Sequence, residues 1–267
     1  MNLYLWKYYF GRTGHLFEHH FTPLVQDTRF TNVKKLLILA TVGDPKSLRL
    51  AVKTRATFPA DWHCLVLSYN ASVVGDAFHS CRVVTQPGRW GHLVRNAVPF
   101  TKEYDYVALV LDDLSVSISP DTLVETLRRY DGSVISPGIR EATHMVFWNK
   151  NCLYETPFIE IYYMIFDQTA WLCFASLFDA FPPDYDGLSG WGLDLCMQQH
   201  CKFRMLYDNR ISANHHAYLR PKKGDTTQAS SDVQTLNTFV SKTAAHEECF
   251  TVEDVPHMFK RSTCLQK

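Results

Sequence analysis

The chain has 267 residues, of which 46% are hydrophobic and 20% are charged, so it can bury a sizeable core. Lysine plus arginine and aspartate plus glutamate both number 27, and this balance gives no indication of binding to a nucleic-acid backbone or a membrane surface. The composition excludes a disordered chain and favours one large globular domain, or a domain with an elaboration.

The eight cysteines form no C-x-x-C pair and mostly lie in apolar runs. Their spacing disfavours zinc ribbons and redox motifs, and it predicts reduced thiols scattered through the core. We find neither the pattern of a secretory signal nor a window of about 18 apolar residues that could span a bilayer. We therefore expect a cytoplasmic protein without a membrane span, in which the glycosylation sequon Asn70-Ala71-Ser72 means little.

The first part of the chain predicts parallel βαβ units. Residues 1–33 are rich in aromatic side chains and lack periodicity, and we expect them to form an arm that packs on the main domain. Strands are predicted at 34–41, 62–69 and 81–84, with a helix that begins at Pro45 after the first of them. The carboxyl ends of these strands should lie along one edge of the sheet.

A buried strand ending in two carboxylates is the most informative stretch. Tyr106 to Leu111 form an apolar run with the length and Val/Leu content of a strand buried on both faces, and Asp112 and Asp113 follow it directly. Such a strand delivers the two acids to the edge where α/β folds bind their ligands. Two interpretations stay open from this stretch alone, a metal site and an acidic turn that caps the next helix.

The segment before this strand carries a second set of polar candidates. Residues 86–97 contain two glycines, and the helix that follows them carries Arg95 and Asn96. A cation beside a helix could hold a diphosphate. Taken alone, however, the segment is better explained as an ordinary loop followed by a solvated helix.

Further strands are predicted at 133–136, 144–148 and 158–163, and a helix at 119–130. Asp167 is placed to cap a helix that runs through Phe178.

A loop rich in glycine and proline then leads to Gly190-Trp191-Gly192-Leu193-Asp194. This motif could press the Trp191 ring against a sugar and hold Asp194 at a helix N-terminus. The simpler alternative is a tight turn whose acid interacts with the helix dipole, worth only about 0.3–1 kcal/mol. The rarity of the motif favours a function.

Two adjacent histidines end the last predicted strand. Strands are predicted at 204–207 and 211–216, and the second ends in His215 and His216. Carboxylate oxygens with one imidazole suit Mn²⁺ or Mg²⁺, whereas zinc would require more nitrogen or sulfur ligands. Residues 233–240 predict an amphipathic helix, and the tail is weakly patterned.

The order of these motifs resembles the GT-A class of nucleotide-sugar glycosyltransferases. In that class a Rossmann-like half binds the nucleotide, an Asp motif after an inner strand binds the metal, a later acid is the base, and a C-terminal His completes the metal shell. More closely, Leu111-Asp112-Asp113-Leu114, Ser136-Pro137 and Gly190-Trp191-Gly192-Leu193-Asp194 look like an uncharacterised plant and microbial family. Its members carry Asp-Glu-Asp-Leu followed by Gly-Trp-Gly-Leu-Asp.

One departure separates this chain from that family. Leu111 occupies the position of the first motif Asp, so Asp113 aligns with the last, metal-binding acid and Asp112 with the variable middle position. Metal binding then rests on fewer groups, and the contribution of the histidines becomes more important.

The resemblance implies a role for each candidate residue. Asp113 and His216, or His215, would hold Mn²⁺ or Mg²⁺ against the diphosphate. Asp194 would take the proton from the acceptor hydroxyl, which gives inversion, and Trp191 with Gly192 would contact the acceptor. The donor would be bound by residues from several strand ends: Thr41, Val42, Gly43, Asp44, Tyr69, Asn70, Arg95, Asn96, Leu111 and Asp112.

We therefore expect an α/β protein with a GT-A-like single domain, in which a Rossmann-like, mostly parallel sheet is flanked by helices and joined to a smaller mixed region on the acceptor side. The expected parts are an arm at 1–33, a nucleotide-sugar-binding half at 34–116, an acceptor-binding and catalytic half at 117–245, and a tail at 246–267.

The expected function is inverting, metal-dependent transfer of a sugar, from a UDP-sugar above all, to a hydroxyl group of a glycan. The alternatives are a catalytically degenerate glycan-binding or scaffold module and a sugar nucleotidyltransferase. For the last of these, Val42-Gly43-Asp44-Pro45 lacks the basic, glycine-rich signature expected after the first strand.

Overall fold

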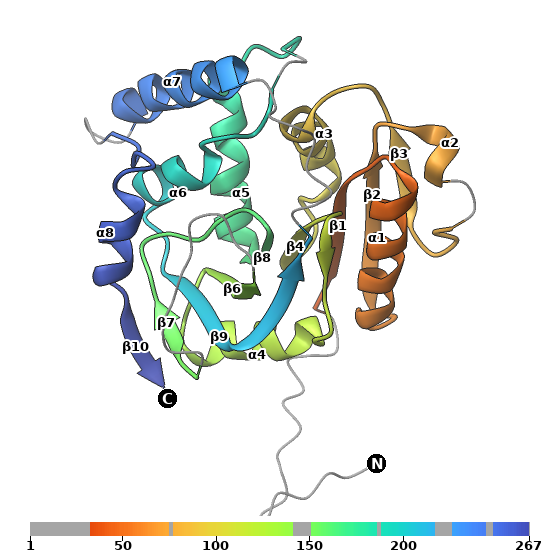
Figure 1. Ribbon diagram of the computed structural model, residues 1–267, viewed down its shortest axis with the longest axis horizontal. Helices are drawn as coiled ribbons and strands as arrows, with labels where there is room; N and C mark the ends of the chain where they lie inside the picture. Colours follow the sequence, from red (N-terminus) through yellow and green to blue (C-terminus); the bar gives the residue numbers. More distant parts are fainter. Residues whose placement is uncertain are drawn as a thin grey trace, which may run out of the picture. The chain divides into compact units, whose positions relative to one another are not determined.

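A ten-stranded mixed sheet runs through the part of the chain from Lys34 to Lys267 (Figure 1). The computed structural model describes residues 33–74, 77–140, 151–185, 188–216, 226–243 and 248–266. The main strand order is β10-β7-β9-β6-β8-β4-β1-β2-β3, and β5 pairs with β9 beside this path. The three predicted strands before residue 86 and the apolar strand after residue 105 are all present.

The half of the sheet nearest β3 is entirely parallel. Its four strands lie in the order β3-β2-β1-β4, and helices connect them in the manner of βαβ units. The elements are β1 (Lys35–Val42), α1 (Pro45–Thr57), β2 (Trp62–Ser68), α2 (Ala71–Val74), β3 (Arg82–Thr85), α3 (Trp90–Ala97), the 3-10 turn η2 (Val98–Phe100) and β4 (Tyr106–Leu111).

The other half is mixed because β8 enters antiparallel between β4 and β6. The long strand β9 runs parallel to β6, so only β5, β7 and β8 oppose the direction shared by the other strands. The strands are β5 (Leu114–Ser115), β6 (Val134–Arg140), β7 (Leu153–Glu155), β8 (Tyr163–Asp167), β9 (Met205–His215) and β10 (Thr263–Gln266). The expected α/β fold with a mostly parallel, helix-flanked sheet is confirmed.

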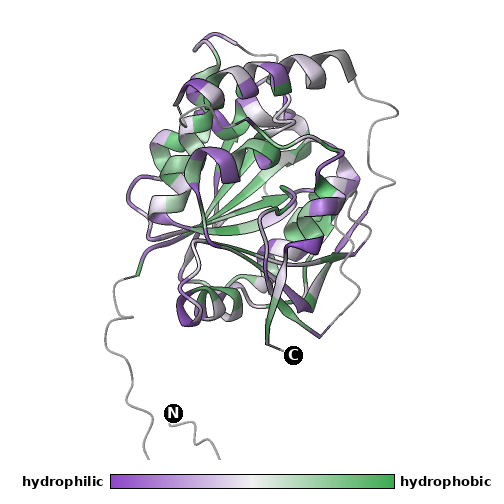
Figure 2. Cartoon of the chain, turned by 90° about the vertical axis from the view of Figure 1, so that its left-hand side faces the viewer, coloured by the Kyte–Doolittle hydropathy of each residue, from purple (hydrophilic) through white to green (hydrophobic). Residues whose placement is uncertain are grey.

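Helices cover both faces of the sheet, and an apolar cluster lies under each layer. The strands are correspondingly hydrophobic along their length, as Figure 2 shows. One cluster joins the sheet to α3, α5, α6 and α7, and the other joins it to α1 and α4. The remaining elements are α4 (Pro120–Arg129), α5 (Gln168–Ser176), η3 (Leu177–Ala180), α6 (Leu193–Cys201), α7 (Thr226–Thr243) and α8 (Val255–Lys260).

Local sequence signals account for several helix starts. Asp44 caps α1 by accepting hydrogen bonds from the backbone of Lys46 and Ser47, and the Ser47 side chain completes a capping box. Asp167 caps α5 through the backbone N–H of Ala170 at 2.7 Å, as predicted.

Two predicted strand assignments are wrong. The predicted strand at 158–163 does not form, because Phe158 and Ile159 are buried without sheet pairing and β8 begins only at Tyr163. The two strands predicted at 204–207 and 211–216 are parts of a single strand, β9, which runs from Met205 to His215. The predicted strand at 144–148 and the arm at 1–33 lie outside the described residues, apart from Val33.

The prediction of reduced thiols is wrong, because all eight cysteines are paired in disulfides. The bonds join Cys64 to Cys81, Cys152 to Cys264, Cys173 to Cys201 and Cys196 to Cys249. Cysteine spacing identifies metal and redox motifs made by neighbouring residues, whereas three of these bonds join positions 28 to 112 residues apart.

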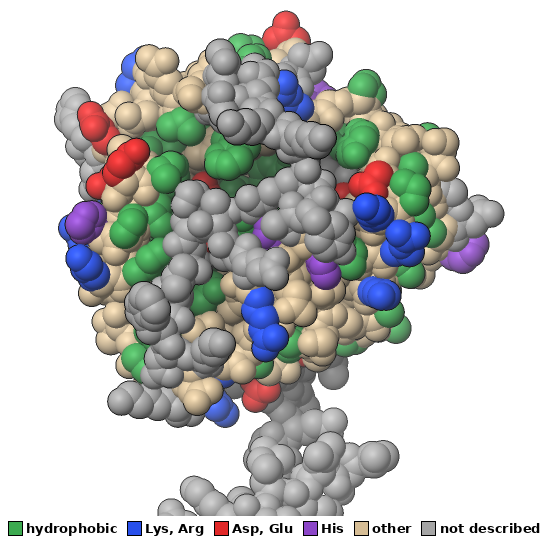
Figure 3. Space-filling view, in the orientation of Figure 1, with side chains coloured by type: hydrophobic (Ala, Val, Ile, Leu, Met, Phe, Trp, Pro, Cys, Tyr) green, Lys and Arg blue, Asp and Glu red, His purple; other side chains and the backbone are tan. Residues whose placement is uncertain are grey.

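Among the described residues, no helix is both long and apolar enough to cross a membrane. Side chains of both charges are spread over the face shown in Figure 3, in keeping with the balanced composition.

Candidate active site

Asp113 and His215 lie beside each other at the carboxyl end of β4. The strand ends at Leu111, the chain turns through Asp112 and Asp113, and β5 then pairs with β9 so that Leu114 lies opposite His215. His215 Nε2 is 3.0 Å from Asp113 Oδ2. Sheet pairing thus brings together an acidic motif and a histidine that are 102 residues apart in the sequence.

The two adjacent histidines contact different partners. His216 Nε2 is 3.0 Å from Ser115 Oγ, while its backbone N–H donates to the Asp113 carbonyl at 2.9 Å. The His215 side chain is fully buried and packs on the Tyr162 ring, with 4.5 Å between the ring centroids. Of the two histidines, His215 is the one placed to share a ligand with Asp113.

Asp113 also carries a carboxylate oxygen that has no hydrogen-bond partner among the described residues. Asp113 Oδ1 is buried, and among the described residues no donor forms a hydrogen bond to it. Burying such an oxygen without a partner costs about 1–3 kcal/mol, which a bound cation would offset. A carboxylate and an imidazole suit Mn²⁺ or Mg²⁺, and Asp113 and His215 are the two residues that would hold such an ion.

The protein supplies few further ligands to this position. Within the described ranges, no third His, Cys, Asp or Glu converges on the Asp113–His215 pair. Phosphate oxygens of a substrate and water would therefore complete the shell, as is usual for Mg²⁺ sites. The one described group of three candidate ligands lies elsewhere, at Cys173, His200 and Cys201, and a disulfide already joins its two sulfurs.

Leu111, at the position of the missing acid, packs with both apolar clusters of the sheet. It therefore contributes apolar packing rather than a metal ligand. Asp112 is partly exposed, and its negative charge helps to raise the pKa of Tyr69, as does that of Asp44, although burial of the hydroxyl is the largest cause. Asp44 and Asp112 therefore lie close enough to Tyr69 for their charges to act on its hydroxyl, and the three residues follow the ends of β1, β4 and β2.

The predicted donor-binding residues after β1 and β2 lie together. The Tyr69 ring covers Gly43 so closely that a Cβ there would overlap the ring at 1.8 Å, and Asn70 Nδ2 donates to the Gly43 carbonyl at 3.2 Å. Tyr69 is 48% exposed, so its ring offers a surface on which a planar base could stack. Val42 is buried in an apolar cluster of the core, whereas the side chain of Thr41 lies outside the described residues.

Arg95 and Asn96 are engaged in holding the protein together. The Arg95 guanidinium donates to the carbonyls of Pro182, Pro183 and Tyr185 at 2.7–2.9 Å. Asn96 Nδ2 lies 3.3 Å from Gln86 Oε1 and 3.1 Å from His92 Nε2. Arg95 thus ties α3 to the loop after η3, and Asn96 ties α3 to the segment before it. This arrangement favours a structural role over contact with a diphosphate.

The Gly-Trp-Gly motif forms a tight turn that leaves its ring exposed. Gly190 and Gly192 have φ angles of 85° and 88°, which are strained for any residue with a Cβ. A Cβ on Gly190 would also lie 2.1 Å from the Trp90 ring, and one on Gly192 would lie 2.6 Å from Val233. Between them, the Trp191 side chain is 59% exposed and therefore open to a ligand.

A buried aspartate on α7 anchors this turn. Asp232 is fully buried and accepts hydrogen bonds from the Ser189 backbone at 2.7 Å, from the Ser189 hydroxyl, and from the Tyr185 hydroxyl at 3.1 Å. The Ser189 hydroxyl oxygen in turn accepts from the Trp191 backbone N–H at 3.2 Å. The position of Trp191 thus depends on Asp232.

Asp194 has the properties expected of a general base. It lies in the first turn of α6, is partly buried, and accepts a hydrogen bond from the Leu195 backbone at 3.0 Å. Burial and the nearby negative charge of Glu160 raise the pKa of Asp194 to about 7, against backbone hydrogen bonds from Leu195 and Ile161 that lower it. A carboxylate with this pKa can take up a proton near neutral pH.

Residues 160–162 connect Asp194 to the Asp113–His215 pair. The Ile161 backbone hydrogen-bonds to Asp194, whereas the next residue, Tyr162, packs on His215 and accepts a hydrogen bond from the Leu111 backbone at 2.9 Å. A short stretch of chain therefore touches both acidic motifs, and the structure brings them to the same edge of the sheet.

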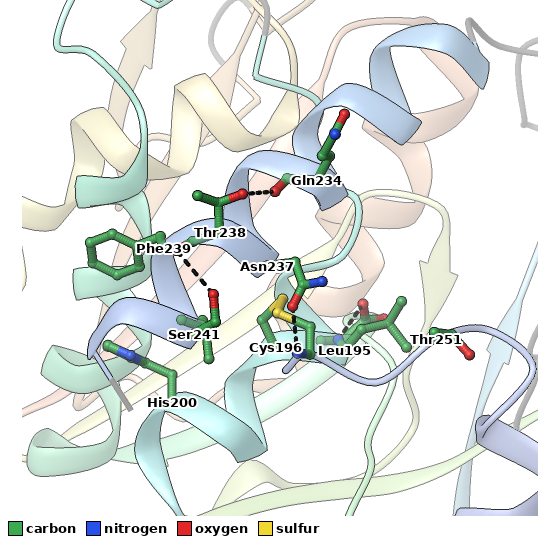
Figure 4. The surroundings of a disulfide bond; sticks show 12 residues. Leu195, Cys196, His200, Gln234, Asn237, Thr238, Phe239, Ser241 and Thr251 are labelled. Atoms are coloured by element: carbon green, nitrogen blue, oxygen red, sulfur yellow. Dashed lines mark hydrogen bonds between the residues drawn. A yellow bond between two sulfur atoms is a disulfide. The ribbon is translucent and has the colours of Figure 1, made fainter. Parts of the chain in front are cut away.

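Two disulfides hold the helix that carries Asp194. Cys196 is joined to Cys249, and Cys201 at the end of α6 is joined to Cys173 on α5. Figure 4 shows the first bond, beside which Asn237 of α7 accepts a hydrogen bond from the Cys249 backbone at 2.9 Å. The Phe250 backbone also donates to the Leu195 carbonyl at 3.1 Å.

Sequence reasoning missed three contributors to this site. Glu160 is an isolated acid inside an otherwise apolar run, and this contrast could have identified it. Tyr162 lies in the same run and carries no such signal. Asp232 lies in a polar stretch where nothing distinguishes it from a solvated surface residue.

Comparison with known proteins yields similarity of structure only. No protein-family model matches the chain, and no curated protein matches it. GalNAc-T7, solved with UDP, GalNAc and Mn²⁺, is similar with a TM-score of 0.55 and 8% identity over 86% of this chain and 56% of that one. The mannosyltransferase PcManGT from Pyrobaculum calidifontis, solved with GDP-Man and Mn²⁺, gives 0.51 and 14% over 86% and 70%.

A third similar structure is TarS of S. aureus, with a TM-score of 0.50 and 10% identity over 78% of this chain and 43% of TarS. The chain thus spans less than half the length of TarS. At these identities the similarities show the fold alone, which is that of GT-A-type glycosyltransferases. The closer resemblance to a plant and microbial family stays a prediction.

Proposed function

We propose that this protein is a metal-dependent glycosyltransferase that moves a sugar from a nucleotide-diphosphate donor to a hydroxyl group of a glycan, with inversion. The observation that carries the proposal is the buried Asp113 Oδ1 next to His215 at the carboxyl end of β4, an oxygen to which no described residue donates a hydrogen bond. The GT-A-type fold supports it, because α/β sheets bind ligands at this edge.

Each residue has a part in the proposed reaction. Asp113 and His215 would hold Mn²⁺ or Mg²⁺, which when bound stabilises negative charge on the leaving diphosphate. Tyr69 would stack on the base of the donor, a UDP-sugar in the first instance, above Gly43. Trp191 would present its exposed ring to the sugar or acceptor, and Asp194 would take the proton from the attacking hydroxyl.

Calorimetric titration with Mn²⁺ and UDP tests the metal assignment. We expect nucleotide to bind only when Mn²⁺ is present, and Asp113→Asn or His215→Ala to weaken that binding at least about tenfold. His216→Ala is the matched control, because its ring faces Ser115, and it should leave binding nearly unchanged. Metal-independent binding of nucleotide, or equal effects of both histidine variants, would refute the assignment. A hydrolysis screen over UDP-, GDP- and dTDP-sugars would then identify the donor.

One observation favours the alternative of a glycan-binding module on a degenerate fold. The described residues supply only two protein ligands, and Leu111 packs in the apolar clusters where related motifs have an acid. A module of this kind would bind glycan through Trp191 but show no Mn²⁺-dependent affinity for any nucleotide. The same titration therefore separates the two functions.

The disulfides bear on where the protein works. Four disulfides in one chain are typical of proteins from oxidising environments and rare in the cytosol. We therefore propose an oxidising compartment in place of the cytoplasm. The intact mass of the native protein should be lower than that of the reduced protein by two hydrogen atoms for each disulfide. Eight thiols that react with an alkylating reagent in the native protein would contradict this.

A further inference from the structure

A pocket of about 750 Å³ lies at the amino ends of the parallel strands, away from the candidate active site. Leu36 of β1, Trp62 and His63 of β2 and Arg82 of β3 all line it, and each is at or next to the first residue of its strand. Asp113 lies two residues beyond the end of β4, at the opposite edge of the sheet. The pocket has the volume of a small-molecule site.

Positive charge accumulates in this pocket without local compensation. Arg55, Arg82 and Lys102 all line it, and among the described residues none of them pairs with a carboxylate. The acid in the lining is Glu103, which pairs with Lys34 Nζ at 2.7 Å. A chain with no net charge thus concentrates around one cavity three cations that form no ion pair with a described carboxylate.

Arg55 adds an unsatisfied donor. Its Nη1 donates to the Phe58 carbonyl at 2.9 Å, which fixes the side chain between α1 and the pocket. Its Nε is buried and has no hydrogen-bond partner in the described part of the protein. A guanidinium with a buried, unused N–H is suited to an anionic acceptor.

Aromatic groups supply the apolar part of the pocket. The Arg82 guanidinium stacks on the Phe100 ring, with 4.0 Å to the centroid, and Phe100 is 39% exposed. This cation–π contact orients the planar group beside an open ring. The His63 ring lies edge-on to Tyr104 and its Nδ1 is 2.8 Å from the Tyr104 hydroxyl, which makes a fixed polar wall.

We propose that this pocket binds a small organic anion, a phosphate or sulfate ester carried on a ring compound such as a sugar. The anion would face Arg55, Arg82 and Lys102, and the ring would lie against Phe100. The ester could belong to a free sugar phosphate or to a sulfated glycan, because both offer the same charged group. The site does not depend on the proposed transferase function.

Titration of the protein at low salt tests the proposal. The ligands are glucose 6-phosphate, a sulfated heparin disaccharide and unsubstituted glucose, and calorimetry measures the binding of each. We expect one of the two esters to bind saturably at or below about 1 mM, and glucose not to bind. The ester that binds more tightly identifies the source of the ligand. Absence of saturable binding by both esters would overturn the proposal.

Variants locate the binding. Arg82→Gln and Lys102→Gln should each weaken ester binding about tenfold or more, because each removes a charge from the lining. Lys53→Gln is the matched control, since Lys53 is an exposed cation on α1 outside the lining, and Asp113→Asn should bind the ester as the native protein does. Arg55→Gln should weaken binding too, but replacing this partly buried side chain could also prevent folding, so the test rests on the other two variants. Unchanged ester affinity in both Arg82→Gln and Lys102→Gln would refute the proposed site.

Discussion

The two acidic segments of the candidate active site are held in different ways. The segment at Asp113 is fixed by the sheet, since β4 precedes it and β5 follows it. Strand β5 pairs with β9, and the His216 backbone N–H donates to the Asp113 carbonyl. The segment at Asp194 lies outside the sheet. It is held by a turn with two left-handed glycines, by the buried Asp232, and by two disulfides on α6.

This difference indicates which part of the site is robust. Backbone pairing places Asp113 beside His215 and would tolerate many side-chain changes nearby. The placement of Asp194 and Trp191 depends on a few particular side chains and bonds, each of which can be removed singly. The predictions below therefore concern the second segment, and measure whether it fails while the first one persists.

The largest effect is expected for Asp194→Asn. Without a carboxylate to accept the proton, the transfer rate should fall about 10²–10⁴-fold, whereas Mn²⁺-dependent nucleotide binding should stay unchanged. In the native protein the rate should rise with pH through an apparent pKa near 7, since the base must be deprotonated. Asp184→Asn, in the exposed loop before the motif, is the control. An unaltered transfer rate in Asp194→Asn would show that Asp194 is not the base.

The same substitution has an effect on stability that needs no substrate. Because the folded state raises the pKa of Asp194 from 3.8 to about 7, the native protein keeps a proton that the unfolded chain has already released. The native protein should therefore lose stability relative to Asp194→Asn as pH rises between about 4 and 7. By pH 8 this loss should reach about 1–4 kcal/mol in unfolding free energy, whereas below about pH 3.5 the titration of Asp194 should contribute none. Denaturant unfolding of both proteins over this pH range measures the change.

Removal of the Cys196–Cys249 disulfide should come next in size. Loop-closure entropy predicts a loss of about 4 kcal/mol in unfolding free energy for Cys196→Ala with Cys249→Ala. The matched pair is Cys64→Ala with Cys81→Ala in the parallel half, where the shorter loop predicts about 3 kcal/mol. Only the first pair should also slow transfer, because, of these two bonds, only Cys196–Cys249 is attached to α6. Equal loss of transfer in both pairs, at equal folded fraction, would contradict this.

The sheet-held segment was the more predictable of the two for a physical reason. An apolar run bounded by acids signals a buried strand within a few neighbouring residues, so β4 and the edge reached by Asp113 could be predicted. The sequence narrowed the partner of Asp113 only to the two adjacent histidines. Side chains alternate between the two faces of β9, so the register between β9 and β5 decides which histidine ring faces Asp113.

The second segment could be identified but not explained from the sequence. Gly190 and Gly192 signal a turn, yet its anchor, Asp232, is more than 40 positions away, and so is Cys249 from Cys196. Such contacts are made by tertiary packing, on which local periodicity carries no information. The prediction of reduced thiols failed for the same reason, because each cysteine considered alone resembles an apolar core residue.

The smallest effect is expected for Asp232→Asn. An amide keeps one acceptor oxygen, but its NH₂ group cannot accept, so a donor among Ser189 and Tyr185 is left without a partner at a cost of about 1–3 kcal/mol. The loosened turn should make Trp191 more accessible to acrylamide, measured as the fluorescence difference from Trp191→Phe in each background. Mn²⁺-dependent nucleotide binding at Asp113 should not change, since that segment is held by the sheet.

Asp254→Asn is the matched control for this substitution. Asp254 likewise accepts hydrogen bonds from a backbone N–H and a hydroxyl, both of Thr251. It is exposed, however, and lies directly before α8, far in sequence from the Gly-Trp-Gly turn. Its replacement should leave the quenching of Trp191 as in the native protein. If Asp232→Asn and Asp254→Asn alter that quenching equally, the turn does not depend on its buried anchor. The two acidic segments would then be equally robust, and the contrast between sheet-held and side-chain-held parts of the site would fail.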